Sequence, residues 1–167
     1  MRKGFFTKLA LQNIKKNSKT YIPFIVTSVT MIMVFFIVAS LKFNPDLLNI
    51  KGATSLLMVM NIGIIMLALI STIFLFYTNS YLIKQRRKEF AVFNILGMEK
   101  KHIAKILSIE TLIVYLSSML MGLSFGLLLY KLVEAGLLKL IKMSVKIEFH
   151  IIPSAIGATV ILFTAIF

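Results

Sequence analysis

The stretch Tyr21–Leu41 reads YIPFIVTSVTMIMVFFIVASL, 21 residues without a charged side chain. As an α-helix it would be about 31 Å long, which matches the hydrocarbon core of a bilayer. A core helix of a soluble bundle keeps a polar face, and residues 31–38 offer none. A cleaved signal peptide fits poorly, because its apolar region is only about 7–15 residues long. We therefore predict a retained membrane span in an all-α integral membrane protein.

Three further segments share this apolar character, and we predict spans at residues 56–83, 106–130 and 151–167. The overall composition agrees, with 59% hydrophobic and 15% charged residues. Soluble domains have about 45–50% and about 25%, respectively. The fold class is thus a polytopic protein with four transmembrane helices. The fourth span has no polar flank or basic anchor after it, so it is either a marginal span or one that is cut short.

The charge of the chain is strongly basic, with 19 Lys and Arg against 6 Asp and Glu. These residues flank the apolar runs, which argues for a membrane topology and against nucleic-acid binding. Residues 1–20 carry six basic side chains and residues 84–105 carry seven, whereas residues 42–55 carry two and residues 131–150 carry four. The positive-inside rule then places the N-terminus and residues 84–105 in the cytoplasm. We predict a multi-pass protein of the bacterial cytoplasmic membrane.

The connecting segments differ in character. Residues 1–20 predict a basic amphipathic helix on the inner surface, because Phe6, Leu9, Ala10 and Ile14 follow helical spacing. The alternative is a basic anchor without fixed structure. Residues 42–55 are a turn-rich outer loop. Residues 131–150 form either an outer amphipathic helix or, in part, an extension of the third span.

The most informative connection is residues 84–105, which read KQRRKEFAVFNILGMEKKHIAK and are called the elbow below. We expect the helix of the second span to continue to about Leu96. Gly97 would end it in the left-handed conformation, and a short second helix would begin near Glu99. Exposed apolar side chains at the tip need a partner protein, or alternatively the lipid surface.

Two features within the spans are candidate functional positions. Glu110 is the one ionisable side chain inside a predicted span, and such residues are functional candidates. It either pairs with Lys105 or another nearby cation, or takes part in conformational coupling. Ser118, Gly122 and Gly126 recur every four residues, a spacing that lets two membrane helices approach closely. The alternative is that these small residues are merely tolerated against lipid.

Catalytic motifs are absent from the sequence. There is no G-x-x-x-x-G-K-[ST] motif for ATP hydrolysis and no cysteine. The two histidines, His102 and His150, fall on opposite sides of the predicted membrane and cannot share a metal. We predict a non-catalytic chain without cofactor or metal.

Three runs in the elbow carry a resemblance: Arg86–Phe90, Asn94–Met98 and Lys100–Ile103. Together they resemble the cytoplasmic signature of FtsX-like ABC transporter permeases. The resemblance implies that the elbow is a coupling helix seated in a separate cytoplasmic ATPase subunit, and that Arg86 and Glu89 position its stalk. The implied contact residues are Phe93, Leu96, Gly97, Met98, Lys100, Lys101 and His102.

The resemblance can be narrowed. The short first outer loop, together with Leu11–Asn17 and Lys105–Glu110, looks like the bacitracin-type (Bce) permeases. These permeases handle antimicrobial peptides that act on the cell envelope. The chain would then be the N-terminal portion of a permease that transports or removes an amphiphilic envelope substrate and packs against the remaining permease spans. The alternative is a sensor or signal-relay module that contacts a membrane histidine kinase.

Overall fold

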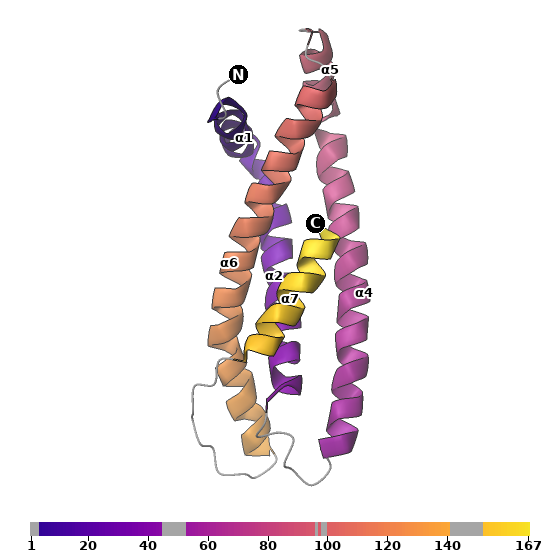
Figure 1. The fold of residues 1–167 in the computed structure, drawn as a ribbon, viewed down its shortest axis with the longest axis vertical. Helices are drawn as coiled ribbons and strands as arrows, with labels where there is room; N and C mark the ends of the chain where they lie inside the picture. Colours follow the sequence, from indigo (N-terminus) through magenta and orange to yellow (C-terminus); the bar gives the residue numbers. More distant parts are fainter. Residues whose placement is uncertain (1–3, 45–52, 96, 98–99, 141–151) are drawn as a thin grey trace.

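The structure is a computed structural model that describes residues 4–44, 53–95, 97, 100–140 and 152–167. In these ranges every regular element is an α-helix. Figure 1 shows the helices, which are α1 (Gly4–Lys16), α2 (Ser18–Lys42), α4 (Ala53–Gln85), α5 (Arg87–Ile95), α6 (Lys100–Leu140) and α7 (Pro153–Ile166). The predicted all-α class is thus confirmed for the described residues.

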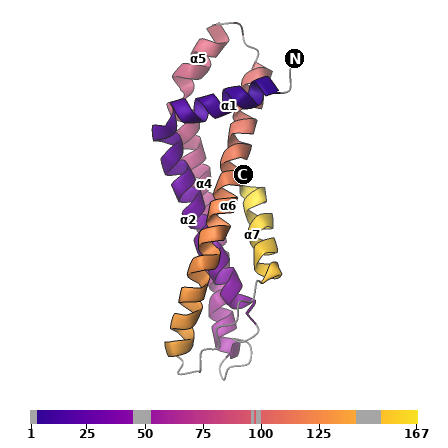
Figure 2. The same cartoon turned by 90° about the vertical axis from the view of Figure 1, so that its left-hand side faces the viewer.

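Helix α2 is the centre of the bundle, because it packs against α6, α4 and α7. Its side chains Phe24, Ile32 and Phe36 are almost fully buried. The ring of Phe35 meets that of Phe163 on α7 edge-to-face, with ring centroids 5.8 Å apart. Helix α1 lies across the bundle axis at one end, and α5 projects from the same end (Figures 1 and 2).

Three helical segments are long and apolar enough to cross a membrane: Ser18–Lys42, Thr54–Gln85 and Lys100–Leu137. They correspond to the first three predicted spans. The fourth prediction, residues 151–167, is represented by α7, a helix of 14 residues, shorter than the about 20 residues of a full span. Pro153 lies in the first turn of α7, where its missing N–H costs no hydrogen bond.

The elbow differs from its predicted shape in two respects. The helix of the second span does not run unbroken to Leu96, because a turn at Arg86 separates α4 from α5. There the Arg86 N–H bonds the carbonyl of Ile83, three residues back, at 3.2 Å. The second short helix is not a separate element either: α6 begins at Lys100 and runs without a break to Leu140.

The outer connections are described only in part. Residues 131–140 continue α6, so at these positions the segment is an extension of the third span. Residues 141–151, and residues 45–52 of the outer loop, lie outside the described residues.

The small residues of α6 lie where this helix meets α2. A Cβ atom placed on Gly122 would lie 2.7 Å from Cγ2 and 2.8 Å from Cβ of Ile32. A Cβ on Gly126 would lie 2.7 Å from Cδ1 of Phe36. Ser118, one turn earlier, is fully buried. The missing side chains therefore let two apolar side chains of α2 reach the surface of α6.

We predict that Gly122→Ala lowers the stability of the bundle. The added methyl group must displace the buried Ile32, and overpacking of this kind costs about 1–3 kcal/mol. The matched control is Gly136→Ala in the same helix, where a Cβ meets nothing within 4 Å. Thermal unfolding in detergent should show a lower midpoint for Gly122→Ala only. Equal midpoints for both variants would contradict the close packing of α2 and α6.

Candidate functional site

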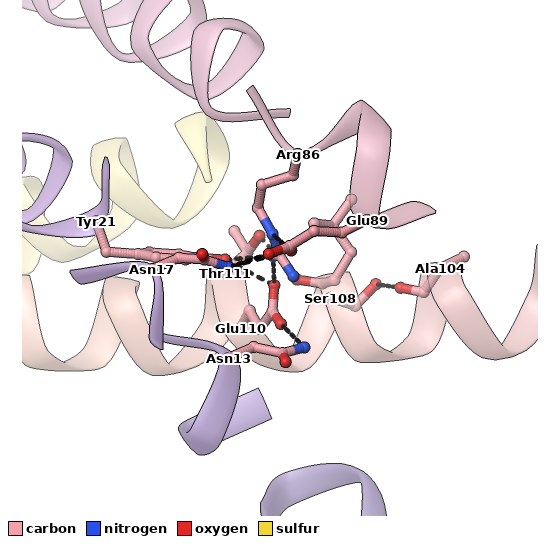
Figure 3. Close-up of polar contacts among 10 residues, drawn as sticks. Asn13, Asn17, Tyr21, Arg86, Glu89, Ala104, Ser108, Glu110 and Thr111 are labelled. Atoms are coloured by element: carbon pink, nitrogen blue, oxygen red, sulfur yellow. Dashed lines mark hydrogen bonds and ion pairs between the residues drawn. The ribbon is translucent and has the colours of Figure 1, made fainter. Parts of the chain in front are cut away.

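Six polar side chains meet where α1, α2, α5 and α6 come together, as Figure 3 shows. They are called the junction network here: Asn13, Asn17, Tyr21, Arg86, Glu89 and Glu110. The two most distant members in sequence that bond directly, Asn13 and Glu110, are 97 positions apart.

Glu110 is the buried centre of the junction network, with 1% of its surface exposed. Its Oε1 accepts a hydrogen bond of 2.9 Å from Asn13 Nδ2, and its Oε2 accepts one of 2.7 Å from the Tyr21 hydroxyl. The guanidinium of Arg86 forms an ion pair with the same Oε2. The cation that serves Glu110 is therefore Arg86, which reaches it from the turn between α4 and α5.

Arg86 is nearly as buried as its partner, with 3% exposed. Its Nη1 donates to the Tyr21 hydroxyl at 2.5 Å, and its Nε pairs with Glu89 Oε2 at 3.0 Å. The guanidinium also lies 5.2 Å from the ring centroid of Phe90, within cation–π range. Burial by itself lowers the pKa of Arg86, but the hydrogen bond and charge of Glu110 outweigh this and raise it above its ordinary value. Arg86 is thus held as a cation.

Asn17 connects the N-terminal segment to the elbow. Its Nδ2 donates to both carboxylate oxygens of Glu89, at 2.8 and 3.1 Å. Asn17 stands at the N-cap position of α2, yet its side chain makes no capping bond. An asparagine at this position commonly caps its own helix. Here the amide serves a tertiary contact instead.

Glu89 is ionised across the physiological range. Burial tends to raise its pKa, but the hydrogen bonds from Asn17 and Arg86 and the charges of Arg86 and Lys16 bring it below the ordinary value of 4.5. The junction network therefore contains two carboxylates, one guanidinium, two amides and a phenol.

The structure unites some predicted site residues and leaves others apart. Arg86, Glu89 and Glu110 belong to one network, although the sequence offered them as a stalk pair and a separate intramembrane acid. At the elbow, Gly97 has the left-handed φ of 81° that was predicted for it. Lys100 and Lys101 are exposed and His102 is half-buried. The side chain of Phe93, and residues Leu96 and Met98, lie outside the described residues.

Asn13, Asn17 and Tyr21 are the network residues that sequence reasoning did not assign to a site. Tyr21 is the first residue of the apolar stretch that predicts the first span, but it is 2% exposed and bonds to Glu110. The three residues are spaced by four, which would put them on one face of a single continuous helix. The structure instead ends α1 before Asn17 and begins α2 after it, so the spacing alone did not predict their common site.

A second polar cluster lies at the opposite end of α2 and α6. The Nδ2 of Asn44 donates to the Tyr130 hydroxyl at 2.9 Å and to Glu134 Oε1 at 2.5 Å. Lys131 Nζ pairs with the other oxygen of Glu134 at 2.8 Å. Asn44, Tyr130 and Glu134 are all buried. Each end of the α2–α6 contact thus carries a hydrogen-bonded carboxylate.

Comparison with known proteins places these features in a family. Residues 61–167 match the family described as FtsX-like permease C-terminal. The chain belongs to the FtsX-like permease family. It is 29% identical over 160 residues to the bacitracin export permease protein BceB of Bacillus subtilis, and 32% identical over 159 residues to the protein of the same name from Halalkalibacterium halodurans. These matches cover 96% and 95% of this chain.

A third relative of this permease is the uncharacterized ABC transporter permease YvcS of Bacillus subtilis, 27% identical over 161 residues. The chain spans about a quarter of the length of these curated relatives, between 24% and 25%. The predicted resemblance to FtsX-like and bacitracin-type permeases is confirmed. The chain is a membrane protein of the ABC transporter permease family.

We predict that breaking the Arg86–Glu110 pair from either side is costly. Glu110→Gln leaves the buried guanidinium with only the partly exposed Glu89 as an anion, and Arg86→Gln leaves the buried Glu110 carboxylate without this cation. Each should lower the free energy of unfolding by about 3–5 kcal/mol. The double variant should lose less than the sum, because neither charge then remains alone.

Thermal unfolding in detergent measures these differences. The matched control is Ser108→Ala, two residues from Glu110 on α6, since that exposed hydroxyl bonds only the carbonyl of Ala104 in its own helix, at 3.0 Å. Strict additivity of the two losses would contradict a direct pair.

We also predict how acid affects α5. Because the pKa of Glu89 is lower in the folded protein than its ordinary 4.5, its stabilising contribution is complete above that value. The contribution is lost as the pH falls through the lowered pKa. A spin label at the exposed Val92 should therefore stay immobile down to about pH 4.5 and gain mobility only below it. Glu89→Gln should remove this transition; a transition near neutral pH in the parent protein would contradict the assignment.

Proposed function

We propose that this chain is part of the non-catalytic membrane subunit of an ABC transporter. In this proposal, a separate cytoplasmic ATPase binds the elbow. Nucleotide-driven movement of the ATPase then shifts α5 and α6, and the permease transports or removes an amphiphilic envelope substrate such as an antimicrobial peptide. The cytoplasmic side is the end that carries α1 and α5, because the two most basic segments lie there.

The observation that carries the proposal is the shape of the elbow in a chain of this family. Helix α5 ends at Ile95, Gly97 turns the chain with a φ of 81°, and α6 begins at Lys100. Residues other than glycine rarely adopt this backbone conformation. Ile95 is 84% exposed, and the next turn of chain presents Lys100 and Lys101. An exposed apolar side chain followed in sequence by two exposed cations suits a protein groove that carries carboxylates.

Helix α6 is suited to transmit such movement across the membrane. Its 41 residues form one unbroken helix, which is about 61 Å long at 1.5 Å per residue. It begins at the elbow, carries Glu110 of the junction network, and reaches Glu134 at the opposite end. A push on its first turn therefore acts on both polar clusters without an intervening loop.

The substrate class rests on relatives alone. Two of them are named bacitracin export permease proteins. Since the chain corresponds to about a quarter of their length, we assign none of its residues to substrate binding.

Charge reversal at the elbow tests the ATPase contact. The permease chain carrying Phe93→Asp, Lys100→Glu and Lys101→Glu should lose co-purification with a tagged ABC ATPase subunit co-expressed from the same host. The physical reason is that the variant places three negative charges where the proposed ATPase groove would bind an apolar group and two cations.

The matched control reverses two exposed lysines of α1, Lys8→Glu and Lys15→Glu, at the same end of the bundle. This variant should retain the ATPase. Undiminished binding by the elbow variant, with normal expression, would refute the proposed contact.

A further inference from the structure

We propose that Asn17 is a positioning residue that fastens the elbow to the junction of α1 and α2, so that these helices move together with α5. The elbow would then be attached to the rest of the protein at three places: through α4, through α6, and through Asn17 to the N-terminal segment. The contact is inferred from geometry alone. Its consequence for coupling rests on the proposed function.

Helix α5 needs this support because it is short. It has nine residues, and isolated helices below about 12–15 residues are marginal in water. Much of its surface is open: Val92 is 53% exposed and Ile95 is 84% exposed. Helix α5 makes only sparse contacts with α4 and α6. Its position is therefore determined largely by polar contacts at its first turn.

Those polar contacts lead to the N-terminal segment. Glu89, in the first turn of α5, accepts two hydrogen bonds from Asn17. Asn17 is the residue that separates α1 from α2. Arg86, one residue before α5, bonds the Tyr21 hydroxyl of α2. A rotation of α5 about the Arg86 turn would have to break these contacts or carry the N-terminal helices with it.

The network also has one unused donor. Nη2 of Arg86 is buried and has no hydrogen-bond partner among the described residues. A buried donor without an acceptor costs free energy.

The chemistry of the Asn17–Glu89 contact permits a sharp test. Asn17→Asp puts two carboxylates within hydrogen-bonding distance and should release α5. Adding Glu89→Gln restores the contact with the roles exchanged. The Gln amide then donates to the new carboxylate at position 17, and its carbonyl oxygen accepts from Arg86 Nε. The double variant has the same net charge as the parent.

Two spin labels report the contact directly. The chain has no cysteine, so Lys8→Cys on α1 and Ile95→Cys on α5 provide the two label sites. Any cysteines elsewhere in the full permease are replaced first. The distance distribution is measured on the full permease in nanodiscs without ATPase. The parent should give one narrow peak, Asn17→Asp should lose it, and Asn17→Asp with Glu89→Gln should regain it.

The matched control is Gln12→Glu, an equal change of charge at an exposed position of α1, which should keep the narrow peak. A narrow peak in Asn17→Asp, or no recovery in the double variant, would overturn the inference. A global folding defect is recognised because it would broaden the distribution between labels at Thr72 on α4 and Leu120 on α6, far from the contact.

A second measurement separates this inference from the proposed function. In complex with the ATPase, Asn17→Asp should keep ATPase binding and lose stimulation of ATP hydrolysis by bacitracin. If the parent permease binds no ATPase, the proposed function fails while the label distances still test the contact. If Asn17→Asp releases α5 but bacitracin still stimulates ATP hydrolysis as in the parent, the Asn17–Glu89 contact exists but has no part in coupling. The proposed role of Asn17 would then be wrong.

Discussion

The ion pair between Arg86 and Glu110 is the contact on which the end of the bundle that carries α1 and α5 depends. Both side chains are almost fully buried, and a charge so placed is stable only beside its opposite. To meet Glu110, the chain must turn at Arg86, which ends α4 and starts α5. The same pair draws in Tyr21 and Asn13, so α1, α2 and α6 are positioned by it as well.

The α2–α6 interface is held by apolar packing in its middle and by polar contacts at its two ends. In its middle, Gly122 and Gly126 admit Ile32 and Phe36 of α2, and dispersion forces between close helices hold the pair. At its two ends, Glu110 and Glu134 accept hydrogen bonds from residues of the neighbouring segments. Lipid competes well for apolar surfaces but poorly for such bonds. The polar ends therefore determine the register in which the small residues meet.

In the proposed function, this arrangement passes a movement of the elbow to the membrane-spanning helices. The described side chains of α5 are mostly exposed, whereas Arg86 at its base is buried. Force applied at Gly97 would reach α6 along one continuous helix and would reach α1 through Glu89 and Asn17. This transmission requires a continuous helix, which is α6, and a polar contact at the base of α5, which is the junction network.

Much of this protein was determined by local sequence. Apolar runs about as long as the hydrocarbon core is thick predict the first three spans, and the left-handed turn at Gly97 follows from glycine's freedom at positive φ. The tertiary structure alone decided the partners. Glu110 lies nearer to Lys105 in sequence, yet Arg86 reaches it because the packing of α2 between α4 and α6 brings the Arg86 turn to the face of α6. Helix α4 ends at Gln85, and the turn that follows places Arg86 against Glu110, a contact that no local sequence pattern predicts.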